Sequence, residues 1–127
     1  MVMQLISKPL TDYHTGELVG MHCYGVDDQA TRLCCASWHL LGPTKAEVYG
    51  VTNDDATPDQ MLTLNQELEA SAKAAGVEQL VALVSKAVAS HFIEVYGWTY
   101  SISPDHDAVN VWIHKRLVEP WGAGEVG

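Results

Sequence analysis

One long helix, framed by two stretches that favour strands, most constrains how this chain can fold. Its start is Thr57-Pro58-Asp59-Gln60, where Thr is a capping residue, Pro suits the first helical position and Gln completes a capping box. Apolar residues then recur at intervals of three and four up to Gly76, namely Met61, Leu64, Leu68, Ala72 and Ala75. Residues 77–84 follow as a nearly continuous apolar run, which predicts a central strand buried on both faces. The helix therefore predicts a strand–helix–strand crossover.

The segments around this crossover alternate in the manner of a sheet protein. The expected order is strand, hairpin, strand, long helix, strand, helix and closing hairpin. The predicted class is α+β, with a mixed, mainly antiparallel sheet of about six to seven strands and two main helices. After an N-terminal strand, the expected strands cover residues 17–26, 32–41, 46–52, 77–84, 98–103 and 109–116, and the second helix covers residues 86–95.

Length and charge narrow the function classes. A chain of 127 residues suits one domain, here residues 1–117, followed by a Gly-rich tail over residues 118–127. With 16 Asp and Glu against 7 Lys and Arg, the formal charge is −9, which argues against nucleic acid or an anionic membrane as a partner. The same charge motivates a third hypothesis, an acidic inhibitor that mimics nucleic acid. With 18% charged residues, however, its mimicking surface would carry few carboxylates.

The cysteines and the length of the apolar runs indicate in which compartment the protein is expected. No apolar run reaches the roughly 18 to 20 residues of a membrane span, and the N-terminal residues lack a basic leader. Three cysteines, two of them adjacent, favour a reducing compartment over a disulfide framework. We expect a cytoplasmic or virion-internal protein.

Candidate metal ligands gather in the first hairpin: Cys23, Cys34, Cys35, His22 and His39. If Asp28-Gln29 is the centre of this hairpin, Cys23 faces Cys34 and His22 faces Cys35, and the cluster could bind zinc. Adjacent cysteines point to opposite faces of a strand, however, and no C-x-x-C spacing is present. Buried free cysteines are therefore the favoured interpretation. A nucleophilic cysteine would need one of the histidines beside it to lower its pKa.

Three further features have a structural and a functional interpretation. Asp105-His106-Asp107 could chelate a cation but is first of all a turn between strands, so we predict no metal site. His91, beside Phe92 on the second helix, is expected to be a core or rim residue. Among the four tryptophans, Trp121 in the polar tail is the best candidate for an exposed anchor.

The order of elements, with the segment IEVYGWTYSI that ends the second helix, resembles the GNAT superfamily of acyl-CoA-dependent N-acetyltransferases over residues 17–117. The resemblance implies a loop of the type Q/R-x-x-G-x-G/A before the long helix, whose backbone N–H groups hold the coenzyme A pyrophosphate. Residues 53–60 stand there without Gly, Lys or Arg. Asp54, Asp55 and Asp59 would repel a pyrophosphate, and Pro58 removes one donor.

A second pattern implied by the resemblance is Asn-x-x-Ala-x-x-x-Tyr-x-x-x-Gly-Phe, whose Tyr serves as general acid. Three positions match it, namely Ala89, Gly97 and Trp98. Lys86 stands in place of Asn and Ile93 in place of Tyr, so no hydroxyl occupies the position of the acid. Tyr96, three residues further, is the partial substitute. The family also places two helices between its first two strands, for which residues 8–16 leave no room.

A kept chain order beside a lost coenzyme site predicts a catalytically inactive GNAT-like domain that acts through protein–protein contacts and needs no cofactor. Its contact residues would be Trp121, Asp54 and Asp55. Small proteins of tailed bacteriophages, among them an internal virion protein of short-tailed phages, are similar in size and order. The expected partners are therefore virion proteins, host proteins or copies of the chain itself.

The alternative is a divergent acetyl-CoA-dependent N-acetyltransferase. In this interpretation Val48, Tyr49, Val51 and Thr57 bind acetyl-CoA, and Tyr96 is the catalytic residue.

Overall fold

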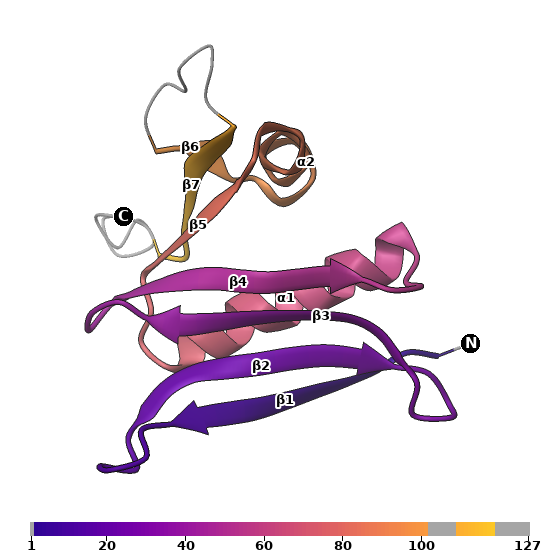
Figure 1. The fold of residues 1–127 in the computed structure, drawn as a ribbon, viewed down its shortest axis with the longest axis horizontal. Coiled ribbons are helices and arrows are strands. Elements are labelled where there is room, and N and C mark those ends of the chain that lie inside the picture. The colour runs from indigo at the N-terminus through magenta and orange to yellow at the C-terminus, as the bar shows by residue number, and fades with distance from the viewer. Residues whose placement is uncertain (1, 102–108, 119–127) are drawn as a thin grey trace, which may run out of the picture.

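The computed structural model describes residues 2–101 and 109–118, and these form one seven-stranded sheet with two helices (Figure 1). The strand order in the sheet is β1-β2-β3-β4-β5-β7-β6, and β4 and β5 are the parallel pair. The predicted α+β class and the mixed, mainly antiparallel sheet are confirmed. The elements are β1 (Gln4–Thr11), β2 (Leu18–Val26), β3 (Arg32–Leu40), β4 (Lys45–Asn53), α1 (Pro58–Ala74), β5 (Gln79–Ser85), α2 (Lys86–Tyr96), β6 (Thr99–Tyr100) and β7 (Asn110–Arg116).

Two expectations about strands need correction. The strand expected over residues 98–103 is only Thr99–Tyr100, and residues 102 and 103 lie outside the described residues. The strand after α1 is not buried along its whole length, because Leu83 is 47% exposed while Leu80, Val81 and Ala82 are buried. Burial on both faces is therefore limited to the first half of β5, where β4 and β7 flank it.

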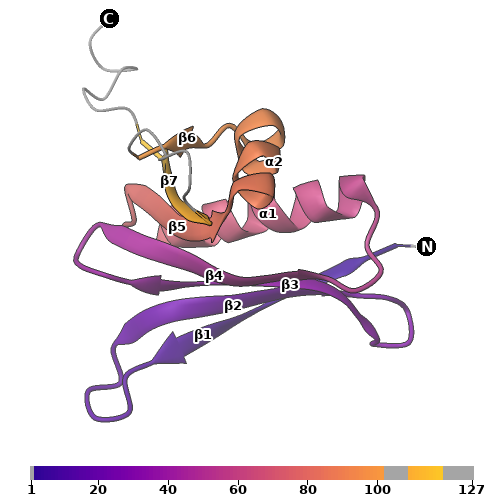
Figure 2. The ribbon, with the colours of Figure 1, turned by 45° about the horizontal axis from the view of Figure 1, so that its top comes forward.

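Helix α1 forms as its sequence predicts. Thr57 Oγ1 accepts a hydrogen bond from the Gln60 N–H, and Gln60 Oε1 accepts one from the Thr57 N–H, which completes the capping box. Leu64, Leu68 and Ala72 are buried against β2 and β3. Both helices lie on the same side of the sheet, so one core forms between them and that face (Figure 2).

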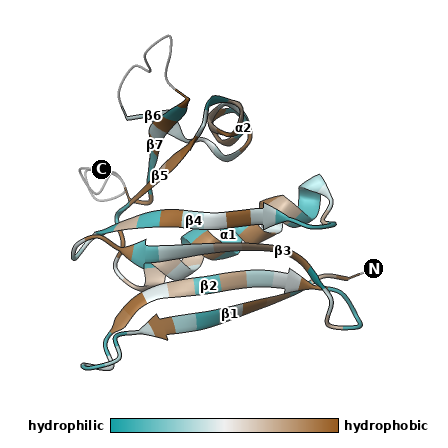
Figure 3. Cartoon of the chain, in the orientation of Figure 1, coloured by the Kyte–Doolittle hydropathy of each residue, from teal (hydrophilic) through white to brown (hydrophobic). Residues whose placement is uncertain are grey.

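The opposite face of the sheet has no helix over it in the described part of the chain (Figure 2). The segment between β1 and β2 is a tight turn in which the Asp12 N–H donates to the Glu17 carbonyl at 2.8 Å, so the two strands pair directly. This agrees with the expectation that no helices fit there. Alternation along β4 directs Ala46 and Val48 to the core and Glu47 and Tyr49 to the open face. Figure 3 shows the hydropathy changing in bands along β4.

The register of the first hairpin differs from the expectation that underlies the zinc alternative. Cys23 lies opposite Ala36 and His22 opposite Ser37, so neither faces a cysteine. The turn is longer than expected because the Asp27 carboxylate accepts hydrogen bonds from two backbone N–H groups, and a register shift between Gly25 and Val26 displaces the strands further. His22 instead contacts Ser37, with 2.6 Å between Nδ1 and Oγ.

Neither described helix is both long and apolar enough to cross a membrane.

Candidate functional site

The parallel strands β4 and β5 stay together for only three positions and then separate. They pair at Lys45↔Gln79, Ala46↔Leu80 and Glu47↔Val81. In Figure 1, β5 leaves β4 at an angle and carries α2 away with it. Beyond Glu47 and Val81, each strand therefore presents an edge to the other that is not paired in the sheet.

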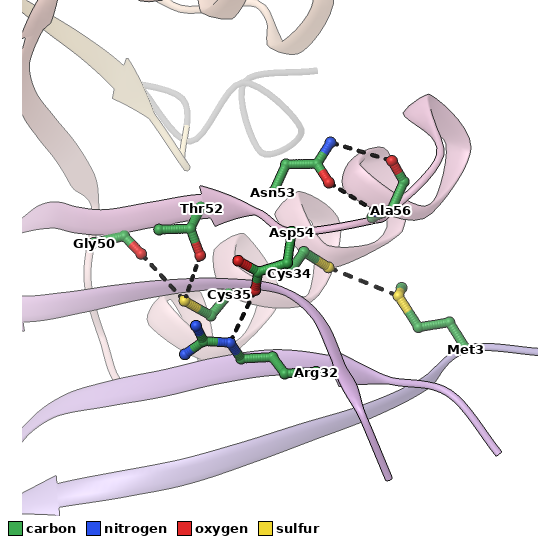
Figure 4. Close-up of polar contacts among 9 residues, drawn as sticks. All are labelled: Met3, Arg32, Cys34, Cys35, Gly50, Thr52, Asn53, Asp54 and Ala56. Atoms are coloured by element: carbon green, nitrogen blue, oxygen red, sulfur yellow. Dashed lines mark hydrogen bonds and ion pairs between the residues drawn. The ribbon is translucent and has the colours of Figure 1, made fainter. Parts of the chain in front are cut away.

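A bulge in β4 accompanies this separation. Cys35 pairs with Thr52 and Ser37 with Tyr49, so two residues of β4, Gly50 and Val51, lie opposite the single residue between those β3 positions. Gly50 has a φ of +64°, which a residue with a side chain adopts at a cost. The Cys35 thiol donates to the carbonyl of Gly50 across the bulge, as Figure 4 shows. Such bulges bend a strand, and here the bend lies where β4 parts from β5.

A cavity of about 280 Å³ occupies the gap between the two strands. Its wall includes Glu47, Tyr49 and Leu83, which belong to the open face, and Val48, Ala82 and Val84, which belong to the core face. Helix α2 adds Val88 and Phe92, and its capping residue Ser85 also lines the cavity. The cavity thus opens through the sheet, and the positive end of the α2 dipole faces it.

A second cavity of about 380 Å³ continues from the first. Val51, Val88 and Phe92 line both, so the two form one path, which we call the β4–α2 groove. At its far end the groove reaches Asn53 and Met61, at the end of β4 and the start of α1. The walls of the second cavity are mainly apolar, and its further lining residues are Ala87, His91 and Tyr96.

Tyr96 stands in the inner wall of the second cavity. Its ring contacts His91 and Phe92 edge-on, with centroids 5.4 and 5.2 Å away. Burial raises the pKa of the Tyr96 hydroxyl, with the Cys34 thiol as a smaller cause, so this hydroxyl stays protonated near neutral pH. His91 is exposed at the rim of this cavity, in agreement with the rim alternative expected for it.

Glu47 is the carboxylate that lines the gap. It lies on β4 at the last position that still pairs with β5, and its side chain is 26% exposed. His39 on β3 is its cross-strand partner, with 3.6 Å between Nε2 and Oε1, and the His39 ring also contacts Tyr49. Reasoning from the sequence did not single out Glu47, and it considered His39 only as a zinc ligand or as a partner for a nucleophilic cysteine. The alternation along residues 46–49 already assigned Glu47 to the face away from the core, but the gap beside it is a tertiary feature.

The start of α1 is closed by its own hydrogen bonds. The Ala56 N–H donates to Asn53 Oδ1 at 2.7 Å, and Asn53 Nδ2 donates back to the Ala56 carbonyl (Figure 4). The Thr57 and Gln60 N–H groups are used within the capping box at 2.9 and 3.2 Å. Pro58 has no N–H to offer.

Charge at this helix start is also partly compensated. Arg32 Nε donates to Asp54 Oδ2 at 3.0 Å, and the N–H groups of Asp54 and Asp55 both donate to the Leu33 carbonyl. The sequence-based argument of three repelling aspartates overlooked this pair, which joins residues 22 positions apart. Asp55 and Asp59 keep the loop acidic.

The structure brings some of the predicted site residues together and separates others. Val48, Tyr49 and Val51 line the gap, whereas the Thr57 side chain is used as a helix cap and lines neither cavity of the groove. Asp54 and Asp55 are exposed at the start of α1. Trp121 and the Asp105-His106-Asp107 turn lie outside the described residues.

The cysteines are free and buried. Burial raises the thiol pKa of Cys23 and of Cys34, which keeps both protonated and unsuited to attack as thiolates. Within residues 2–101 and 109–118, no three His, Cys, Asp or Glu side chains gather as a metal site.

Comparison with known proteins shows the fold. The chain aligns with an assigned acyl-CoA N-acyltransferase from Klebsiella pneumoniae at a TM-score of 0.72 and 15% identity, covering 91% of this chain and 97% of the other. An assigned N-acetyltransferase from Lactobacillus plantarum gives 0.71 and 13% identity, with 93% and 100% covered. A GNAT-family acetyltransferase from Staphylococcus aureus gives 0.65 and 10%, with 77% and 68% covered. The fold is therefore GNAT-like.

No protein-family model matches the sequence, and no curated protein matches it.

Proposed function

We propose that this chain is an N-acyltransferase that takes an acyl group from a coenzyme A-type thioester. The observation that carries the proposal is the gap between β4 and β5, which opens through the sheet and continues as the β4–α2 groove. Two structural neighbours are named as an acyl-CoA N-acyltransferase and a GNAT-family acetyltransferase, which adds support from a shared fold. The finer sequence interpretation, an inactive virion or host-interaction protein, has no support from these comparisons.

The groove suits an acylated pantetheine arm. The arm is a narrow chain with two amide groups, and the unpaired edges of β4 and β5 offer backbone donors and acceptors to it in the manner of an added strand. The apolar walls formed by Val51, Val88 and Phe92 exclude water from the remainder of the arm. The thioester then lies in the gap, beside the start of α2.

The acceptor amine enters from the open face. Glu47 lines the gap on that face, and its carboxylate takes the proton of the acceptor ammonium. The freed nitrogen lone pair attacks the thioester carbon, the new C–N bond forms, and the C–S bond breaks. The nitrogen, positively charged after the attack, gives its second proton to water and becomes the amide nitrogen. The α2 N-terminus, capped by Ser85, favours the negative charge that develops on the carbonyl oxygen and the departing thiolate, which water protonates.

Tyr96 has a different place in this scheme from the one expected for a catalytic acid. It lines the second cavity and not the gap that holds Glu47. We therefore assign Tyr96 to the wall that holds the arm.

Isothermal titration of acetyl-CoA and of desulfo-coenzyme A tests the proposal, together with thiol release in the presence of a small primary amine. Val88 and Val95 offer matched variants, since both are exposed valines of α2, at 41% and 49%, and only Val88 lines the groove. We expect Val88→Trp to fill the groove and weaken donor binding by about tenfold or more, and Val95→Trp to bind like the wild type. No binding of either ligand by the wild type would refute the proposal and favour an inactive scaffold.

A further inference from the structure

The groove and the start of α1 meet at Asn53 and Met61, so a coenzyme A molecule lying in the groove would bring its pyrophosphate to this helix start. A phosphate group binds a helix N-terminus through backbone N–H groups that have no partner inside the protein. The fit of the nucleotide part therefore depends on how many such groups the start of α1 leaves free. Whether the nucleotide part fits is therefore a separate question from whether the pantetheine arm fits the groove.

Most N–H groups at this helix start already have partners. Those of Ala56, Thr57 and Gln60 donate to side chains of the same segment, at distances of 2.7 to 3.2 Å. The Met61 N–H donates to the Thr57 carbonyl at 2.9 Å, and Pro58 has none. An incoming phosphate would have to displace these side-chain acceptors. They compete strongly, because they lie only a few residues from the donors and re-form their hydrogen bonds readily.

The local charge opposes the nucleotide as well. Arg32, the first residue of β3, reaches this loop from outside it, but its Nε already pairs with Asp54. Asp59 occupies the first turn of α1, where its carboxylate takes the favourable place for an anion. Asp55 is exposed beside it. The pyrophosphate does not fit this site, whereas the arm fits the apolar groove.

We infer that the chain recognises its donor as an S-acyl pantetheine thioester and obtains almost no affinity from the nucleotide of coenzyme A. The inference rests on the proposed function, because it concerns the donor that occupies the same groove. A short acyl-pantetheine and the full acyl-CoA share the chemistry that the groove recognises, and the experiment separates them.

The experiment is isothermal titration of S-acetylpantetheine, acetyl-CoA and adenosine 3′,5′-bisphosphate into the full chain at low and at moderate salt. We expect the Kd values of the two thioesters to agree within about threefold, because Arg32 is paired with Asp54 and the carboxylates of the acidic loop oppose a phosphate. Added salt should tighten acetyl-CoA, since it screens the acidic loop, and should leave the uncharged S-acetylpantetheine unchanged. The bisphosphate should not bind.

Two results would overturn the inference and leave the proposed function standing. The first is acetyl-CoA that binds on the order of 10²-fold more tightly than S-acetylpantetheine, as two charge-assisted hydrogen bonds would produce. The second is acetyl-CoA affinity that falls as salt is added. If neither thioester binds, the proposed function fails and the inference fails with it.

Discussion

The gap between β4 and β5 and the start of α1 lie at the two ends of one groove, and they differ in how they use the backbone. In the gap, the two strands stop pairing after three positions and leave their edges open. At the helix start, side chains of the same segment accept hydrogen bonds from the N–H groups of Ala56, Thr57 and Gln60. In the proposed function, the open strand edges of the first region receive a chain with amide groups. The backbone donors of the second region are mostly satisfied within its own segment.

This difference separates binding of the acyl arm from binding of the pyrophosphate, which the GNAT resemblance implies together. An acyl arm and a pyrophosphate belong to the same donor, but they are recognised by different elements and different forces. In the proposed function, apolar burial and strand-like pairing hold the arm in the groove. Backbone N–H groups and positive charge would have to act at the helix start. A chain can lose the second set and keep the first, so the absence of a Gly-rich loop does not by itself imply the absence of acyl transfer.

The largest expected effect is a loss of turnover in Glu47→Gln, a change at the gap. Gln keeps the size of the side chain but cannot take a proton from an ammonium, so turnover should fall by about 10²-fold while the Kd of S-acetylpantetheine stays unchanged. Steady-state kinetics with a small primary amine and titration of the donor measure the two quantities. Glu17→Gln, at the exposed turn before β2, is the matched control. Unchanged turnover in Glu47→Gln would remove the carboxylate from the mechanism.

A smaller effect is expected from Gly50→Ala, which tests the bulge that accompanies the gap. Nothing lies within 4 Å of an added Cβ, so the cost arises from the φ of +64° alone, about 1–2 kcal/mol of unfolding free energy. Gly42→Ala is the control, because its added Cβ also meets nothing and its φ is not in the left-handed range. Urea denaturation measures both. Equal unfolding free energies of the two variants would show that the bulge does not require glycine at position 50.

Features coded within one segment were predicted well from the sequence. Thr57 and Gln60 form the expected capping box, and Leu64, Leu68 and Ala72 form the expected buried stripe, because a helix repeat and its caps depend on residues a few positions apart. Of the four residues expected to bind acetyl-CoA, Val48, Tyr49 and Val51 line the gap and Thr57 does not. Their role in binding stays a prediction.

Features that join distant segments were missed. The first hairpin is shifted because the Asp27 carboxylate organises its turn, and local strand propensity does not report such a shift. The Arg32–Asp54 pair depends on the register between β3 and the segment after β4. The candidate site depends on the separation of β4 from β5, which accompanies a bulge in β4 and the packing of α2. The residue pattern of either strand does not predict this separation.

The smallest effect concerns the helix start itself, through Asp55→Lys. The Asp55 side chain is exposed and its N–H donates to the Leu33 carbonyl, so the change replaces one negative charge by a positive one without removing that contact. We expect acetyl-CoA to bind about threefold more tightly at low salt, with no change for S-acetylpantetheine, because only the nucleotide carries phosphate near this loop. Glu17→Lys changes the net charge equally at the turn before β2 and should leave both donors unaffected. Equal gains in the two variants would mean that the overall charge of the chain, and not the acidic loop, opposes the nucleotide.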